Sequence, residues 1–115
     1  MPFIKLSTNI AVDQHQSDRL LSALSQLVAQ ETGKSERYVM VELTGGKAML
    51  FSGNNQPLAY LECKSIGLNT VQAKALSASI CKLLTTVLPL SADRIYIEFS
   101  NCPAELWGWN RSTFA

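Results

Sequence analysis

The sequence predicts an α/β protein of the α+β type, in which two βαβ repeats form one four-stranded mixed sheet with two helices on one face. A strand–helix–strand pattern occurs once in each half of the chain, and the segments Arg37–Glu42 and Arg94–Glu98 match best. Each helical segment is long enough to connect two parallel strands by a right-handed crossover. The length of 115 residues suits a single domain with one core, spanning residues 1–115.

The first half begins with an apolar, partly alternating run over Phe3–Ser7, which predicts a strand. Residues 8–16 are polar and indicate a loop, and Ser17 is of a type that caps a helix. Gly33 is a suitable end for that helix. Its apolar side chains recur at helical spacing at Leu20, Leu21, Leu24, Leu27 and Val28.

Alternation between faces predicts the second strand over Tyr38–Leu43. Gly45 and Gly46 indicate a turn, and residues 47–51 are interpreted as a further short strand before a loop over residues 52–56.

The second half follows the same plan. Leu58–Lys64 predicts a strand, either Asn69 or Thr70 caps a helix, and Pro89 ends that helix. Arg94–Phe99 predicts the fourth strand, and Leu106–Trp109 a final short one.

If both helices cover one face of the sheet, the other face needs a cover too. Met40, Tyr60 and Tyr96 fall on that second face by alternation. Association of several copies of the chain is one way to bury it.

Composition narrows the classes of function. The formal net charge is +1, and basic residues are scattered, so we expect neither nucleic-acid nor membrane binding. The three cysteines are too far apart and too few for a disulfide framework or a zinc ribbon. The start of the chain lacks the pattern of a signal peptide, and we expect a cytoplasmic location.

Several familiar catalytic patterns are missing. His15 is the only histidine and lies in a polar stretch, so neither a metal cluster nor a Ser-His-Asp triad is indicated. We expect no metal and no cofactor, because the sequence also has no glycine-rich phosphate-binding motif.

The first two residues, Met1-Pro2, offer a different kind of base. Removal of Met1 leaves a prolyl secondary amine, and α-amino groups have an ordinary pKa of about 7.7–8.0. An apolar wall or a nearby lysine would lower that pKa, so the amine could act as a general base at neutral pH. Many chains begin Met-Pro without any such consequence.

Five motifs in order resemble the macrophage migration inhibitory factor family of the tautomerase superfamily, across essentially the whole chain. Met1-Pro2 precedes Thr8-Asn9, and the remaining motifs are Thr32-Gly33-Lys34 with Tyr38, Ser65-Ile66-Gly67, Asp93–Ile97 and the ending Gly108–Ala115.

The resemblance implies a homotrimer with active sites between subunits, and keto–enol tautomerisation of phenylpyruvate-like or dopachrome-like compounds. The small-molecule partner would thus be an aromatic α-keto acid. Pro2 would be the base, Lys34 would bind the carboxylate or enolate side, and Tyr96 would come from the neighbouring subunit. The other implied contacts are Ser65 and the Ile66 backbone amide, with Tyr38, Trp109 and Phe114 as the apolar lining.

Three departures from the family pattern change these expectations. Glu98 stands where the animal members have asparagine, and a carboxylate there would repel an acidic substrate and raise the pKa of the Pro2 amine. Trp107 replaces a smaller aliphatic residue and would narrow the mouth of the pocket. Leu58–Leu61 replaces a Cys-Ala-Leu-Cys segment, so we expect weak or no thiol oxidoreductase activity.

Two alternatives to an isomerase are also compatible with the sequence. The chain could be a cytokine-like or partner-binding trimer with a vestigial pocket, because receptor binding is a property of the family. The same proline could also serve another reaction, as a nucleophile or in addition of water to an unsaturated acid.

Overall fold

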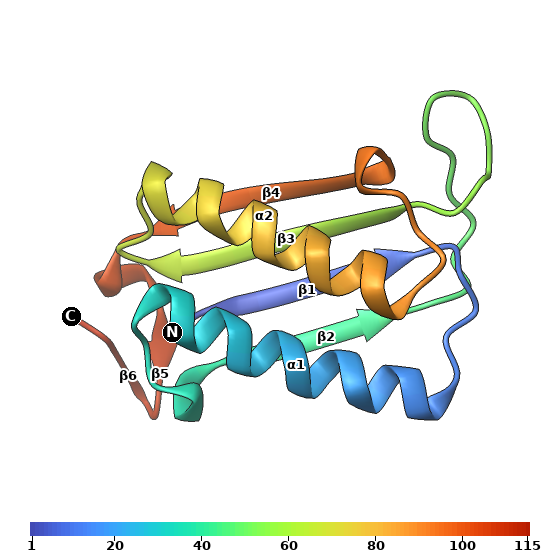
Figure 1. Ribbon diagram of the computed structural model, residues 1–115. Coiled ribbons are helices and arrows are strands. Elements are labelled where there is room, and N and C mark those ends of the chain that lie inside the picture. Colours follow the sequence, from blue (N-terminus) through green and yellow to red (C-terminus); the bar gives the residue numbers. More distant parts are fainter.

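Four strands form one mixed sheet, in the order β2-β1-β3-β4, in the computed structural model, which describes residues 1–115 (Figure 1). The strands are β1 (Phe3–Thr8), β2 (Met40–Thr44), β3 (Ala59–Ile66) and β4 (Ile95–Cys102). β1 pairs with β2 and β3 pairs with β4 in parallel, whereas β1 and β3 are antiparallel at the centre. Each half of the chain is therefore one βαβ unit, and the predicted fold class is confirmed.

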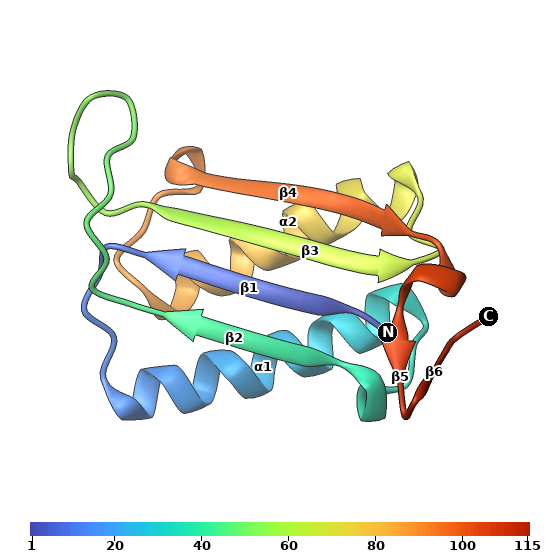
Figure 2. The same cartoon turned by 180° about the vertical axis from the view of Figure 1, so that it is seen from behind.

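The helices α1 (Gln14–Thr32) and α2 (Thr70–Val87) lie side by side on one face of the sheet. The view from behind shows the strands with no helix in front of them (Figure 2). We call this uncovered side the open face of the sheet. Neither helix is long and apolar enough to span a membrane.

Both helices begin with a capping box. The Gln16 backbone N–H donates to the Asp13 carboxylate at 2.8 Å, and the Asp13 N–H donates back to the Gln16 side chain at 3.2 Å. The predicted cap at Ser17 is therefore wrong, because Asp13 satisfies the free N–H groups one turn earlier. Of the two candidates for α2, Asn69 is the cap.

The ends of the helices follow the predicted signals. Gly33 ends α1 with a left-handed φ of 69°, a conformation that costs glycine little. α2 stops at Val87, two residues before Pro89.

The segment between β2 and β3 is a loop, so the predicted strand over residues 47–51 is wrong. It contains only one isolated bridge, between Phe51 and Asn54. The guanidinium of Arg94 instead donates to the carbonyls of Phe51 at 2.8 Å and Gln56 at 3.0 Å. The loop is thus fixed by a side chain from the 3-10 turn Ala92–Arg94, just before β4, rather than by strand pairing.

The core lies between the sheet and the two helices. Alternation in β3 sends Ala59, Leu61 and Cys63 into it, while Tyr60, Glu62 and Lys64 face the open side. The helices contribute a stripe of fully buried side chains at Leu20, Leu24, Val28, Leu76, Ile80 and Leu84.

The chain ends in a two-stranded ribbon, β5 (Gly108–Trp109) with β6 (Ser112–Thr113). The predicted final strand over residues 106–109 begins too early, because residues 104–106 form a 3-10 turn. Asn110 and Arg111 both have positive φ, which allows the tight turn of the ribbon. This ribbon brings the end of the chain next to its beginning, as Figure 1 shows.

Candidate active site

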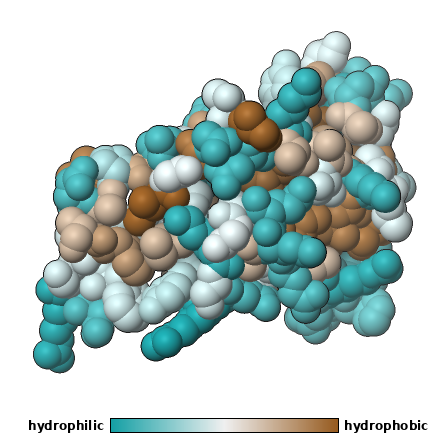
Figure 3. Space-filling model, turned by 60° about the vertical axis from the view of Figure 1, so that its left-hand side comes forward, coloured by the Kyte–Doolittle hydropathy of each residue, from teal (hydrophilic) through white to brown (hydrophobic).

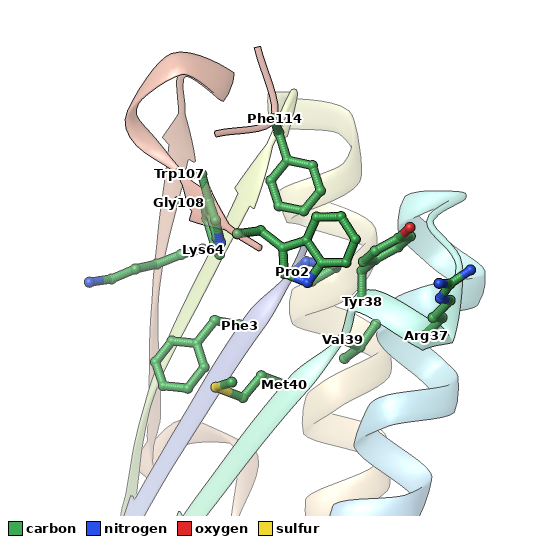
Figure 4. Close-up of a pocket in the computed structure, with 11 residues that line it drawn as sticks. Pro2, Phe3, Arg37, Tyr38, Val39, Met40, Lys64, Trp107, Gly108 and Phe114 are labelled. Atoms are coloured by element: carbon green, nitrogen blue, oxygen red, sulfur yellow. The ribbon is translucent and has the colours of Figure 1, made fainter. Parts of the chain in front are cut away.

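A pocket of about 410 Å³ lies at the end of the sheet where the chain begins. The surface at this end carries hydrophobic patches among hydrophilic side chains (Figure 3), and Figure 4 shows the pocket itself. The lining residues are Pro2, Phe3, Arg37, Tyr38, Val39, Met40, Lys64, Trp107, Gly108, Trp109 and Phe114.

Strand pairing fixes Pro2 at the bottom of this pocket. Its ring is buried, with less than 2% exposed, and its carbonyl accepts a hydrogen bond of 3.0 Å from the Met40 N–H. Because β1 and β2 are parallel, the start of β2 lies beside the start of β1. The 3-10 turn Glu36–Tyr38, which precedes β2, places Tyr38 in the pocket. The second strand was predicted to begin at Tyr38, but β2 begins two residues later, at Met40.

Three aromatic rings form one wall of the pocket. Tyr38 meets Trp109 and Phe114 edge to face, with centroid distances of 5.3 and 5.8 Å. Trp109 and Phe114 stack at 5.5 Å with 12° between their planes. Such a wall suits an aromatic ring and limits the access of water.

The electrostatic environment favours a neutral amine at the start of the chain. The structure includes Met1, so here the Pro2 nitrogen is an amide and the free amine belongs to Met1. Burial, with the nearby positive charge of Lys34, lowers the pKa of that amine below its ordinary value of 8.0. Lys34 follows Gly33 at the end of α1, where its N–H donates to the Ala29 carbonyl at 3.1 Å.

The family model described as macrophage migration inhibitory factor (MIF) matches residues 1–115. The chain belongs to the MIF family. It is 39% identical to the macrophage migration inhibitory factor of Meriones unguiculatus and 38% identical to that of Mus musculus, and each comparison covers 100% of both chains.

Solved structures of MIF homologues share the fold. The homologue from Prochlorococcus marinus superposes with a TM-score of 0.93 at 41% identity, covering 98% of this chain and 99% of the other. The macrophage migration inhibitory factor from Trichinella spiralis gives a TM-score of 0.88 at 30% identity, covering 96% and 98%. The resemblance found in the sequence is therefore confirmed over the whole chain.

The structure of this MIF family member brings five of the predicted site residues together. Four of them, Pro2, Tyr38, Trp109 and Phe114, were expected as the base and the apolar lining, and Trp107 lines the pocket beside them.

The other predicted residues do not line the pocket of a single chain. Lys34 is close enough to influence the terminal amine. Ser65 is 1% exposed and Ile66 half-buried at the end of β3. Tyr96, which is 64% exposed, and Glu98 point to the open face of β4.

Six lining residues were not predicted from the sequence. Phe3, Met40 and Lys64 are paired across β2, β1 and β3, so they form one row on the open face. Their alternation was visible in the sequence, but the pairing register that aligns them was not. Val39 and Arg37 flank Tyr38, and Gly108 lies in the ribbon.

No group of three or more histidine, cysteine, aspartate or glutamate side chains in the structure could hold a metal ion.

Proposed function

We propose that this MIF family member is a keto–enol tautomerase for phenylpyruvate-like, and also dopachrome-like, aromatic compounds. The observation that carries the proposal is the buried Pro2 at the bottom of an aromatic pocket, at a chain end where the pKa of an amine is lowered. Once Met1 is removed, the Pro2 nitrogen becomes a secondary amine with a basic lone pair.

The reaction moves one proton between carbon and oxygen. The neutral amine takes a proton from the carbon next to the carbonyl, the electron pair of that C–H bond forms a C=C bond, and the π pair of the carbonyl moves onto its oxygen. The protonated amine, directly or through water, returns a proton to that oxygen, which gives the enol and restores the neutral amine, and the reverse sequence regenerates the ketone.

Donors near the developing negative charge lower the barrier. The ammonium of Lys34 is assigned to the carboxylate or enolate side, and the backbone N–H of Ile66 to a second polar contact. The stacked Trp109 and Phe114 hold the aromatic ring of the substrate.

We further propose that the active unit is a homotrimer in which Tyr96 and Glu98 complete the pocket of the neighbouring subunit. Tyr96 and Met40 are 64% and 67% exposed on the same face of the sheet, which leaves apolar surface there for another subunit to cover. A second copy covering this face would bury both residues.

Steady-state kinetics on 4-hydroxyphenylpyruvate test the proposed reaction. The Met1-free protein should accelerate tautomerisation with saturation at micromolar to millimolar substrate, as is usual for enzymes. A protein that has lost Met1, is correctly folded and still gives only the uncatalysed rate would contradict the proposal.

Exchange of Glu98 for asparagine is expected to raise kcat/KM for acidic substrates by a few-fold, because it removes a negative charge from the proposed shared pocket. The acidic limb of the pH profile should move to lower pH, since the carboxylate no longer favours the protonated amine. Kinetics of Glu98→Asn beside Glu42→Gln, which alters an acid on the same face outside the pocket, measure the effect. An unchanged kcat/KM for Glu98→Asn would count against this role.

The cysteines are poor candidates for thiol oxidoreductase chemistry. Burial raises the pKa of Cys63 to about 11, and it also raises the pKa of Cys81, so little thiolate exists at neutral pH. We expect the protein to reduce insulin disulfides no faster than a variant in which Cys63 is replaced by serine. Robust reduction by the natural chain, lost in that variant, would show the expectation to be wrong.

A further inference from the structure

Charged side chains on the open face are arranged in rows set by strand pairing. Glu42, Lys5, Glu62 and Glu98 are register partners across β2, β1, β3 and β4, so they form one row. Lys64 lies in the next row, between Phe3 and Ser100. The face therefore has three carboxylates and two ammonium groups.

Glu98 has no opposite charge to balance it within its own chain. Its register partner on β3 is another acid, Glu62, and directly opposed like charges are unfavourable. Glu62 is bound by Lys64 with an Nζ–Oε1 distance of 3.6 Å, the only salt bridge in the chain. If a second copy covers the open face, Glu98 leaves water without a partner, which is costly for a carboxylate.

Of the two cations on this face, only Lys64 lies at the pocket that Glu98 of the neighbouring subunit would complete, and its 3.6 Å contact with Glu62 leaves ammonium donors for a second carboxylate. Lys5 already lies between Glu42 and Glu62 in the pairing register. Lys64 has uncharged register partners on both sides, and 42% of its side chain is exposed. It also lines the pocket, and Figure 4 shows its ammonium pointing away from Pro2.

We propose that Lys64 forms an ion pair with Glu98 of the neighbouring subunit at the edge of the shared pocket. This inference rests on the proposed trimeric tautomerase and assigns Lys64 as a positioning residue that this role requires. The pair offsets only part of the repulsion between Glu98 and the carboxylate of the substrate, so that removal of Glu98 still raises kcat/KM. Lys64 thereby reduces the effect of having a carboxylate at Glu98, where animal members of the family have asparagine, and determines how well the pocket binds acidic substrates.

A double-mutant cycle on kcat/KM tests the pair. Lys64→Gln should lower kcat/KM for 4-hydroxyphenylpyruvate by about 5- to 10-fold in the natural chain, but by less than about 2-fold in the Glu98→Asn background. The methyl ester of the same substrate has no carboxylate, so Lys64→Gln should change its turnover much less. Lys64→Arg keeps the charge and should keep most of the activity.

Exchange of the two charges provides a second, independent readout. Lys64→Glu alone should lower activity and weaken the trimer, measured by sedimentation, and the added change Glu98→Lys should restore part of both. Lys5→Gln serves as the matched control on the same face and should show no coupling to Glu98→Asn.

The outcomes separate the two proposals. Additive effects of Lys64→Gln and Glu98→Asn in an active trimer, or coupling to Lys5 instead of Lys64, would overturn the ion pair and leave the tautomerase intact. Equal losses with the acid and its ester would assign Lys64 a purely structural role, which also contradicts the inference. A natural chain without turnover would overturn the proposed function itself.

Discussion

Replacing Pro2 by glycine is expected to lower kcat for 4-hydroxyphenylpyruvate by about 10²-fold or more, since general-base catalysis is typically worth about 10²- to 10⁴-fold. The pyrrolidine ring holds the nitrogen in a fixed position and is itself buried, with less than 2% exposed. Glycine leaves a primary amine on a freely rotating backbone, so both the burial and the orientation of the base are lost. Steady-state kinetics with the Met1-free variant, verified by mass, measure the effect.

Pro89→Gly is a matched control. Pro89 is exposed to solvent, follows the end of α2, and is distant in the sequence from the residues that line the pocket. Pro89→Gly should keep the kcat of the natural protein. Thermal unfolding of both variants shows whether a loss of activity arises from a loss of fold. A folded Pro2→Gly protein with unaltered kcat would remove Pro2 from the mechanism.

Replacing Lys34 by glutamine is expected to have the second largest effect. It should lower kcat/KM by about 10²-fold, because loss of one preorganised donor to a developing oxyanion typically costs about 10²- to 10³-fold. It should also change the pH dependence in a defined direction. Burial is the larger cause, and the charge of Lys34 the smaller cause, of the lowered pKa of the Met1 amine. We expect the same charge to act on the Pro2 amine once Met1 is removed, so that loss of Lys34 lets the pKa of the Pro2 amine rise. A higher pKa means less neutral amine below pH 8.0, and the acidic limb of the kcat/KM profile moves to higher pH.

The conservative change Lys34→Arg retains the positive charge and should leave the acidic limb nearly in place. Lys47→Gln, on the exposed loop after β2, is the control for a general change in net charge. An acidic limb that stays fixed in Lys34→Gln would show that burial alone sets the pKa of the amine.

The order of the elements could be predicted from the sequence because it depends on local patterns. Alternation marked β2 and β4, helical spacing marked α1 and α2, and Gly33 and Pro89 marked the helix ends. The cap of α1 was missed because Ser17 and Asp13 are both good capping residues. Only the reciprocal bond with Gln16 decides in favour of Asp13.

Long-range contacts account for the remaining errors. Nothing near residues 47–51 indicates that the guanidinium of Arg94 will bind the carbonyls of this segment, so its apolar character suggested a strand. The roles of Pro2 and of the aromatic wall in the pocket were predicted from the family resemblance. Lys64 was missed because its place beside Phe3 depends on the register of β1 and β3, and a single sequence does not specify that register.

In the proposed reaction a free nitrogen on Pro2 is the base, and removal of Met1 tests this role without any other change in the chain. Two preparations of the same sequence, one retaining Met1 and one without it, are compared after intact-mass measurement. We predict that turnover of 4-hydroxyphenylpyruvate rises in proportion to the fraction that lacks Met1, and that the Met1-bearing protein gives only the uncatalysed rate. Equal turnover per chain in both preparations would show that the free Pro2 nitrogen is not the base.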